Sequence, residues 1–444
     1  MKKRYLLDTN ILMSSPKSIY GFKEHDVYIC DATLNELDGL KSEKGDTGYN
    51  AREAIREIDE IRKKGKLSKG IHTQNGGLFR VVICSTLENK LPVDWNINKN
   101  DNKIINVAIN LNAILITNDA SMSAMAELAG VRTESYRNEQ ASETSLNYTG
   151  RAEIVVDAET INKLYKLKKE KISVKSLPFL NEEELTENQY LLIKDGSNTK
   201  SSFIARYSNG HLIPINEKRL IASDVVPKNL RQKFALEALL APADEIPLVI
   251  LKGPAGTAKT FLALAAGLQK VMEENEYNEV LIFRPNVKFD DDIGYLKGDE
   301  MDKIMPLIRP CFDNLKVLLC SKKEDQESAK SKIQYLFDKG TLNAEAMAYL
   351  RGRSINNAWV IFDEAQNASP NQILGAVTRA GENTKIVIVG DPEQIDNPKL
   401  SRTNNGLVYV AEKMMGSSTC AQVTFDNKDC VRSKLAAEAA KRMS

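Results

Sequence analysis

A glycine-rich turn between an apolar run and an Ala/Leu-rich segment constrains the fold of this chain more than any other feature. The apolar run covers residues 247–251, the turn follows it, and the Ala/Leu-rich segment covers residues 261–271. A strand, a glycine turn and a helix in this order direct backbone N–H groups and the positive helix end toward one point. The order predicts a phosphate-binding loop in a doubly wound α/β domain.

The loop also assigns an expected role to its side chains. Lys259 is expected to reach the β and γ phosphates, and the Thr260 hydroxyl to hold Mg²⁺. Ala258 departs from the usual motif, which has a glycine before the lysine, and we expect the helix start to tolerate its methyl group. The loop residues predicted to contact the nucleotide are Gly253, Pro254, Ala255, Gly256, Thr257, Ala258, Lys259, Thr260 and Phe261.

Composition limits the classes of protein that remain. With 444 residues, of which 42% are hydrophobic and 27% charged, the chain is long enough for two or three soluble domains. No run approaches the roughly 18 apolar residues of a membrane span, and the basic N-terminus leads into a strand pattern rather than a signal peptide. The net charge of +1 implies that any contact with nucleic acid comes from local patches.

Cysteine and histidine usage points to carboxylates for any metal chemistry. The six cysteines show no paired metal-ligand spacing, and the chain has only three histidines. We therefore expect reduced thiols in a cytoplasmic protein and no zinc site.

The alternation of strands and helices divides the chain into three regions. Residues 1–137 predict a three-layer α/β domain with a largely parallel sheet, because short apolar runs alternate with helical patterns. Residues 138–222 predict a small β-rich connecting module, in which Ser208-Asn209-Gly210 is typical of a hairpin turn. Residues 223–444 return to α/β alternation. The predicted strands of this last region are residues 248–251, 280–283, 359–362, 385–389 and 422–425.

Two further motifs in the last region fit the phosphate-binding loop. A buried strand ends in Asp363 and Glu364, where ligands bind in parallel sheets. Asp363 is expected to hold Mg²⁺ through water, and Glu364 to orient and deprotonate the attacking water. The strand at 385–389 leads into Gly-Asp-x-x-Gln, and Gln394 is expected to sense the γ-phosphate, although such a tetrad alone is more often a turn.

Together these residues resemble the PhoH-like branch of the superfamily 1 helicase-type ATPases, across the whole second half of the chain. The resemblance implies a RecA-like P-loop NTPase domain that binds ATP. Pro227 to Gln232 is similar to the family's segment ahead of the loop, in which the glutamine contacts adenine. Tyr349 to Arg353 precedes Asp363 as in the family. One departure is Lys297, where the family more often has proline.

The resemblance also supplies two candidate arginines. Thr378-Arg379 and Asp429-Cys430-Val431-Arg432 match family motifs, so Arg379 or Arg432 is expected to stabilise transition-state charge in its own subunit or on a neighbour's ATP. A surface arginine is the alternative for either one. The resemblance further implies a homohexameric ring.

The first region carries four acids in matching contexts. Asp8 ends the first strand, Glu36 lies at the opening of a helix, Asp101 begins another helix and Asp119 ends the strand at residues 114–119. Acids at strand ends and helix starts meet at one edge of a parallel sheet. Crowded carboxylates repel each other unless cations neutralise them, so we predict a Mg²⁺ or Mn²⁺ site that hydrolyses phosphodiesters. Lone helix-capping acids are the alternative.

This arrangement resembles the PIN-domain nucleases, usually ribonucleases, over residues 1–137. All four acids are present. Arg52 and Arg56 follow a glycine-containing loop and are candidates for RNA phosphate contacts, with a solvated helix face as the favoured alternative.

The combination resembles the PIN–PhoH proteins of bacteria and phages, and it implies an ATP-driven RNA helicase motor coupled to a ribonuclease acting on single-stranded RNA. The alternative is an ATP-gated, RNA-binding regulator ring with little unwinding or cleavage. The chain lacks a second RecA-like domain, which favours the alternative.

Overall fold

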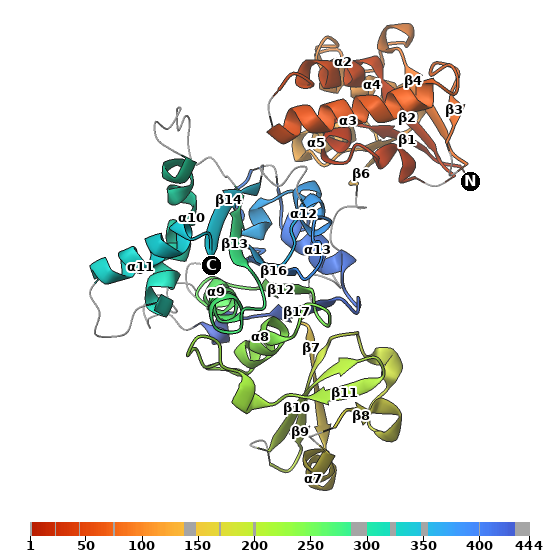
Figure 1. Cartoon of the computed structure of the whole chain (residues 1–444). Helices are drawn as coiled ribbons and strands as arrows, with labels where there is room; N and C mark the ends of the chain where they lie inside the picture. Colours follow the sequence, from red (N-terminus) through yellow and green to blue (C-terminus); the bar gives the residue numbers. More distant parts are fainter. Residues whose placement is uncertain are drawn as a thin grey trace. The chain divides into compact units, whose positions relative to one another are not determined.

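The computed structural model describes residues 2–22, 24–43, 45–73, 76–136, 148–167, 170–198, 201–285, 300–319, 326–347, 354–398 and 400–430. The chain forms two compact units, Met1–Gln140 and Ala141–Ser444 (Figure 1). Among the described residues, no helix is long and apolar enough to cross a membrane.

The N-terminal unit is built on a six-stranded sheet with the order β3-β4-β2-β1-β5-β6. All neighbouring strands are parallel except β3 and β4. The strands are β1 (Arg4–Leu7), β2 (Asp26–Cys30), β3 (Ile71–His72), β4 (Leu78–Val82), β5 (Ile114–Ile116) and β6 (Thr133–Glu134).

Helices cover both faces of this sheet, which gives the predicted three layers. Side chains of α1 (Thr9–Ser14) and α3 (Gly45–Arg62) share one core with Tyr5 and Leu7. Side chains of α4 (Asn100–Leu111) and α5 (Ala120–Leu128) share the other core with Leu6. Successive residues of β1 point to opposite faces because the side-chain period of a strand is two. Helix α2 (Asp31–Leu40) contributes to both cores.

The C-terminal unit begins with a five-stranded sheet of order β7-β9-β10-β11-β8. Asn209 and Gly210 have φ of 48° and 74°, the left-handed conformation that the predicted hairpin turn requires. The short strand β8 and the helix α7 were not predicted from the sequence. The elements are β7 (Arg151–Val156), α7 (Ala158–Leu167), β8 (Ile172–Ser173), β9 (Tyr190–Asp195), β10 (Ser202–Ser208) and β11 (His211–Pro214).

This small sheet is attached to the rest of its unit by buried polar contacts. Arg206 forms ion pairs with Glu237, at 3.1 Å, and with Glu245. It also donates to the side-chain oxygen of Asn188 at 2.6 Å, and the Asn188 amide donates to three backbone carbonyls of residues 417–420. These contacts join segments that lie far apart in the sequence, so the module packs as part of the C-terminal unit.

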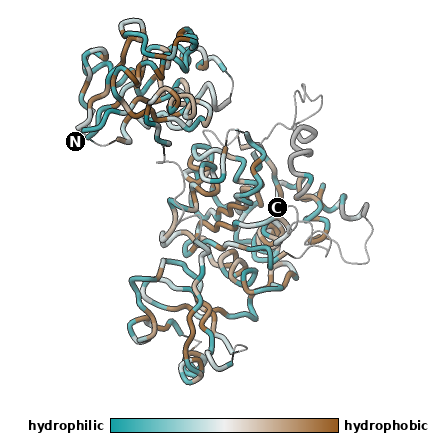
Figure 2. Tube along the Cα trace, turned by 180° about the vertical axis from the view of Figure 1, so that it is seen from behind, coloured by the Kyte–Doolittle hydropathy of each residue, from teal (hydrophilic) through white to brown (hydrophobic). Residues whose placement is uncertain are grey.

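The larger sheet of this unit is parallel throughout, with the order β14-β13-β15-β16-β12-β17. The apolar strands buried on both faces match the five predicted ones, and Figure 2 shows hydrophobic stretches along the centre of the unit. Strand β14 was not predicted, because two of the five residues in its sequence Leu-Asn-Ala-Glu-Ala are polar. The strands are β12 (Leu248–Lys252), β13 (Glu279–Arg284), β14 (Leu342–Ala346), β15 (Ala358–Phe362), β16 (Lys385–Gly390) and β17 (Cys420–Thr424).

Helices cover both faces of the larger sheet as well. One face carries α8 (Leu230–Leu240), α9 (Lys259–Leu268), α10 (Glu300–Leu319) and α11 (Gln326–Asp338). The other face carries α12 (Pro370–Val377) and α13 (Gly406–Lys413) (Figure 1). This is the predicted doubly wound arrangement, and it places the loop between β12 and α9 at the carboxyl edge of the sheet, where ligands bind.

Candidate active sites

The glycine-rich loop turns sharply between β12 and α9. Gly253 has φ of 139°, and a Cβ there would lie 2.5 Å from the backbone oxygen of Phe425. Gly256 has φ of 85°. Ala258 has φ of 70° and ψ of 23°, the left-handed region, and it is the residue just before α9. The helix start therefore does not relieve Ala258: a Cβ in this conformation costs about 1–2 kcal/mol.

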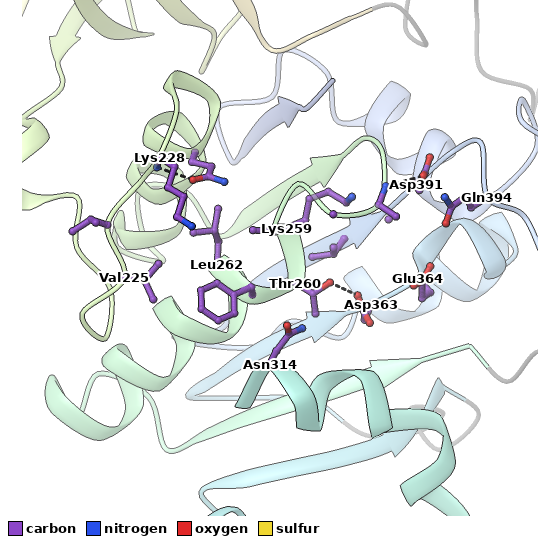
Figure 3. Close-up of a pocket in the computed structure, with 18 residues that line it drawn as sticks. Val225, Lys228, Lys259, Thr260, Leu262, Asn314, Asp363, Glu364, Asp391 and Gln394 are labelled. Carbon is purple, nitrogen blue, oxygen red and sulfur yellow. Dashed lines mark hydrogen bonds between the residues drawn. The ribbon is translucent and has the colours of Figure 1, made fainter. Parts of the chain in front are cut away.

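The two residues at the start of α9 already have polar partners. Lys259 is 7% exposed, and its Nζ donates to the backbone oxygens of Gly253 at 2.7 Å and Pro254 at 2.8 Å. The Thr260 hydroxyl donates to Oδ1 of Asp363 at 2.8 Å (Figure 3). The lysine ammonium is thus held inside the loop, and the threonine hydroxyl faces the acid at the end of β15.

Asp363 and Glu364 follow β15 directly, at the same edge of the sheet. Asp363 is 4% exposed, and its pKa is raised, first by burial and then by the nearby charge of Glu364. Arg284, at the end of β13, opposes this shift and lies 3.3 Å from Oε1 of Glu364. Glu364 has φ of 54°, so the chain turns in a left-handed conformation immediately after the buried acid.

Gln366 connects the acidic segment to the end of β16. Its Nε2 donates to Oε2 of Glu364 at 2.5 Å and to the backbone oxygen of Gln394 at 2.9 Å. Its Oε1 accepts from the backbone N–H of Asp391 at 3.1 Å. Asp391 in turn accepts from the backbone N–H of Ala255 at 3.2 Å. One buried amide therefore joins the acids, the Gly-Asp-x-x-Gln segment and the glycine loop.

A cavity of about 410 Å³ is lined by Lys259, Thr260, Asp363, Glu364 and Asp391. Gln232 lies on its wall, where its Oε1 accepts from the backbone N–H of Lys228 at 2.8 Å. Val225 and Phe261 give the same wall apolar surface. Of the predicted residues, those that line the cavity are Gln232, Ala255, Gly256, Ala258, Lys259, Thr260, Phe261, Asp363, Glu364 and Gln394. Gly253, Pro254 and Thr257 do not line it.

Of the two candidate arginines, Arg379 is described by the structure and does not line this cavity. Arg379 follows α12, is half-buried, and donates from Nη1 to the backbone oxygen of Gly375. Arg432 lies outside the described residues, and so does the whole segment from Tyr349 to Arg353. Just before Arg432, Asp429 accepts from Nη1 of Arg231 on α8 at 2.7 Å.

The four acids of the N-terminal unit lie at the carboxyl edge of its sheet. Asp8 is the N-cap of α1, Asp101 lies in the first turn of α4, and Asp119 is the N-cap of α5. Glu36 lies in the middle of α2, not at its opening, and Asp119 comes three residues after β5 ends rather than within it. The expected edge is right, but the helices rather than the strands carry most of these acids.

Electrostatic coupling shows that the four carboxylates form one cluster. Burial raises the pKa of Asp8 to about 6, hydrogen bonds from Thr117 and Thr9 oppose the shift, and the charges of Glu36 and Asp101 add to it. The pKa of Asp101 is raised by burial and then by the charges of Glu36 and Asp119. Like charges close to a buried carboxylate are what a divalent cation would neutralise, so the residues present fit a Mg²⁺ or Mn²⁺ site.

Two threonines hold the acid cluster together. The Thr117 hydroxyl donates to Oδ2 of Asp8 at 2.7 Å and accepts from the backbone N–H of Asp119 at 3.1 Å. The Thr9 hydroxyl donates to Oε2 of Glu36. Neither threonine was predicted to have a role, although Thr9 directly follows Asp8 and Thr117 lies two residues before Asp119.

Comparison with known proteins identifies both halves. Residues 224–444 match the family model described as PhoH-like protein, and residues 5–137 match the model described as PIN domain. Protein PhoH2 of Bacillus subtilis (strain 168) is 35% identical over 95% of this chain and 96% of its own length. The chain belongs to the PhoH2 family. PhoH2 proteins of Thermobispora bispora and Mycolicibacterium smegmatis are 31% and 29% identical over 98% of this chain and 95% of their own length.

Membership in the PhoH2 family confirms the resemblance drawn from the sequence. An N-terminal PIN domain indicates nuclease-type chemistry with a divalent metal, and a PhoH-like domain indicates ATPase-type nucleotide chemistry. The two candidate sites lie one in each domain, at the carboxyl edge of a parallel sheet in both cases.

Two predicted RNA contacts of the PIN domain have protein partners. Arg52 donates from Nη1 to the backbone oxygen of Lys41 at 2.6 Å, and Arg56 forms an ion pair with Glu53 one helical turn away. These contacts favour the solvated helix face over RNA phosphate contacts for both arginines.

Proposed function

We propose that the chain is an ATP-dependent RNA-processing enzyme, in which the PhoH domain hydrolyses ATP to move single-stranded RNA and the PIN domain cuts it. The observation that carries the proposal is that Lys259, Thr260, Asp363 and Glu364 line one cavity of about 410 Å³. The cluster of four carboxylates in the PIN domain supports the second activity.

In the PhoH domain, the loop N–H groups and Lys259 bind the phosphates, and Gln232, on the wall of the same cavity, contacts adenine. Lys259 exchanges the carbonyls of Gly253 and Pro254 for phosphate oxygens when ATP binds. Thr260 and Asp363 hold Mg²⁺, which neutralises charge on the β and γ phosphates when bound. Glu364 orients the attacking water and accepts its proton.

Gln394 is the proposed γ-phosphate sensor. The backbone oxygen of Gln394 shares the Gln366 amide with Glu364, so a shift of the sensor on phosphate loss reaches the catalytic acid through one side chain. Arg379 or Arg432 completes the site in its own subunit or across the boundary of a homohexameric ring.

In the PIN domain, Asp8, Glu36, Asp101 and Asp119 hold Mg²⁺ or Mn²⁺, which supplies activated water and stabilises the charge on the phosphodiester. Thr117 and Thr9 position Asp8 and Glu36 for this role. The four carboxylates would hold the cation through their oxygens.

The second candidate function is an ATP-gated RNA-binding regulator ring. The contacts of Glu364 favour it, because Arg284 and Gln366 hold the acid that would otherwise activate water. In this case ATP binding, rather than turnover, changes the surface that binds RNA.

A strand-separation and cleavage assay distinguishes the two. The full chain is incubated with end-labelled RNA, single-stranded or as a duplex with an overhang, with Mg²⁺ and with or without ATP. The RNA-processing proposal expects metal-dependent cuts, duplex opening that needs ATP, and an ATPase rate that RNA increases. Intact RNA and an ATPase rate unchanged by RNA support the regulator instead. Native mass spectrometry tests the ring, and a monomer excludes the trans arginine.

A further inference from the structure

Two cysteines that are distant in the sequence meet at the edge of the PIN sheet. Cys30 is the last residue of β2, and Cys84 follows the end of the neighbouring strand β4. The strands are parallel, and Cys30 pairs with Val82, two residues before Cys84. Both cysteines are free thiols, and their sulfur atoms lie within 4.8 Å of each other. The pairing of β2 with β4 therefore brings together two thiols whose spacing in the sequence does not predict a shared site.

Asp31 adds a carboxylate to this pair. The sulfurs of Cys30 and Cys84 and a carboxylate oxygen of Asp31 all lie within 4.8 Å of one another. Asp31 Oδ1 is fixed by the backbone N–H groups of Ala32, at 3.1 Å, and Cys84, at 2.9 Å. Among the described residues, this is the group of three potential metal-ligating side chains whose ligand atoms lie within 4.8 Å of one another.

A separate cavity gives access to the cluster. It has a volume of about 280 Å³, and Asp31 and Cys84 lie on its wall together with Lys103 and the amides of Asn35 and Asn106. None of the four acids of the predicted Mg²⁺ site lines it. Cys30 is buried behind this wall and Cys84 is half-buried, so the cluster has an inner side closed by protein and an outer side open to a small polar space.

We propose that Cys30, Asp31 and Cys84 form a Zn²⁺ site with its fourth position open to this cavity. Two thiolates and one carboxylate suit Zn²⁺, whereas Mg²⁺ prefers oxygen ligands alone. Zn–S bonds of about 2.3 Å place tetrahedral ligand atoms about 3.6–3.8 Å apart, which small side-chain rotations achieve from the present spacing. Water from the cavity fills the fourth position.

The charges of such a site balance locally. Binding displaces the two thiol protons to solvent, so that Zn²⁺ faces two thiolates and one carboxylate, and the site carries one net negative charge. Lys103 on the cavity wall and the N-terminus of α2, which begins at Asp31, both oppose that charge. The ion would tie the start of α2, the helix that carries Glu36, to the segment after β4.

Metal analysis of the purified full chain tests the proposal. After loading with Zn²⁺ and dialysis against excess Mg²⁺, we expect one Zn²⁺ per chain, and Co²⁺ in its place should give the absorption of thiolate-to-cobalt charge transfer. Cys84→Ser should weaken Zn²⁺ binding by more than about 100-fold in a competition assay with a chromophoric chelator, because loss of only a supporting contact costs 10- to 100-fold.

Two control variants assign the ion to this cluster. Asp8→Asn alters the predicted Mg²⁺ site and Cys430→Ser removes a half-buried thiol elsewhere, and both should keep the Zn²⁺ stoichiometry of the parent. Because Cys84 is half-buried, serine should be accommodated there, and circular dichroism checks the fold of the variant. The proposal is overturned if the parent retains no more Zn²⁺ than Cys84→Ser, if Asp8→Asn abolishes retention, or if the two cysteines form only a disulfide.

Discussion

The two candidate sites of this chain lie at equivalent edges of parallel sheets, but they balance their charges differently. In the PhoH domain, Asp363 is buried beside Glu364, yet Thr260, Arg284 and Lys259 all oppose the rise of its pKa. In the PIN domain, hydrogen bonds alone oppose the rise for Asp8, while Glu36 and Asp101 increase it. Cationic side chains therefore act directly on the buried acid of the PhoH site, whereas in the PIN cluster Lys99 acts on Asp101 and hydrogen bonds oppose the shift of Asp8.

This difference indicates how each site meets its ligand. Lys259 and Glu364 already have protein partners, so ATP must exchange contacts that exist, and a preorganised loop lowers the cost of that exchange. In the PIN domain the charges of Glu36 and Asp101 act on Asp8, so a bound cation would relieve their repulsion.

Removing the lysine should have the greatest effect. Lys259→Ala deletes the buried cation that reaches the phosphates, and we expect ATP turnover to fall by about 10³-fold or more, since a single cation on the transferring phosphate is worth this much. Phosphate release measures it. Metal-dependent cutting of single-stranded RNA in the absence of ATP should remain, and its loss would show that the sites are not separate in the way described.

Removing one carboxylate from the PIN cluster should have the next largest effect. Asp8→Asn keeps the size of the side chain but removes a negative charge that would hold the cation. We expect a loss of about 3 kcal/mol of transition-state stabilisation, which corresponds to roughly 10²-fold slower RNA cleavage. ATP turnover should be unchanged. Asp94→Asn, at an exposed acid outside the cluster, is the matched control and should cut like the parent. Equal cutting by Asp8→Asn would refute the nuclease site.

The same contrast predicts a pH-dependent response of the PIN domain to Mg²⁺. Asp8 has an ordinary pKa of 3.8 when unfolded and a pKa of about 6 when folded, so the folded state binds more protons between these values. Stability without metal therefore falls as pH rises through this window, and the full destabilisation is present above pH 6. Mg²⁺ should raise the unfolding temperature more at pH 7.5 than at pH 5.

Asp8→Asn again supplies the control for this measurement. Because asparagine does not titrate, both the fall in stability between pH 4 and 6 and the extra effect of Mg²⁺ at the higher pH should become smaller. An equal effect of Mg²⁺ at both pH values in the parent would mean that the cation does not relieve the charge on Asp8.

Sequence motifs were sufficient where the chemistry lies in contiguous residues. The glycine loop and the Asp363-Glu364 pair are local patterns on apolar strands, and the structure places them around one cavity. Buried parallel strands are also readable because they are apolar throughout, and β14 escaped because its Asn343 and Glu345 break that pattern.

Contacts between distant segments could not be read from the sequence. Gln366 gains its importance from its position between Glu364 and Gln394, and Cys30 meets Cys84 only because β2 pairs with β4. Likewise, Glu36 reaches the acid cluster from mid-helix, a position that requires knowledge of how α2 packs. Such features depend on strand order and helix packing, and local patterns do not encode either one.

The smallest predicted effect concerns the strain at Ala258. Ala258→Gly removes a Cβ from a left-handed residue, which gains about 1–2 kcal/mol, while the added freedom of glycine in the unfolded chain returns about 0.5–1 kcal/mol. We expect a net gain of about 0.5–1 kcal/mol and a rise of roughly 1–3 °C in the unfolding temperature of the PhoH domain. Ala263→Gly, within α9 and fully buried, should instead destabilise it by about 1 kcal/mol or more. A loss of stability in Ala258→Gly as well would show that the preorganisation of this loop does not rest on a strained residue, and the contrast with the PIN site would then rest on charge alone.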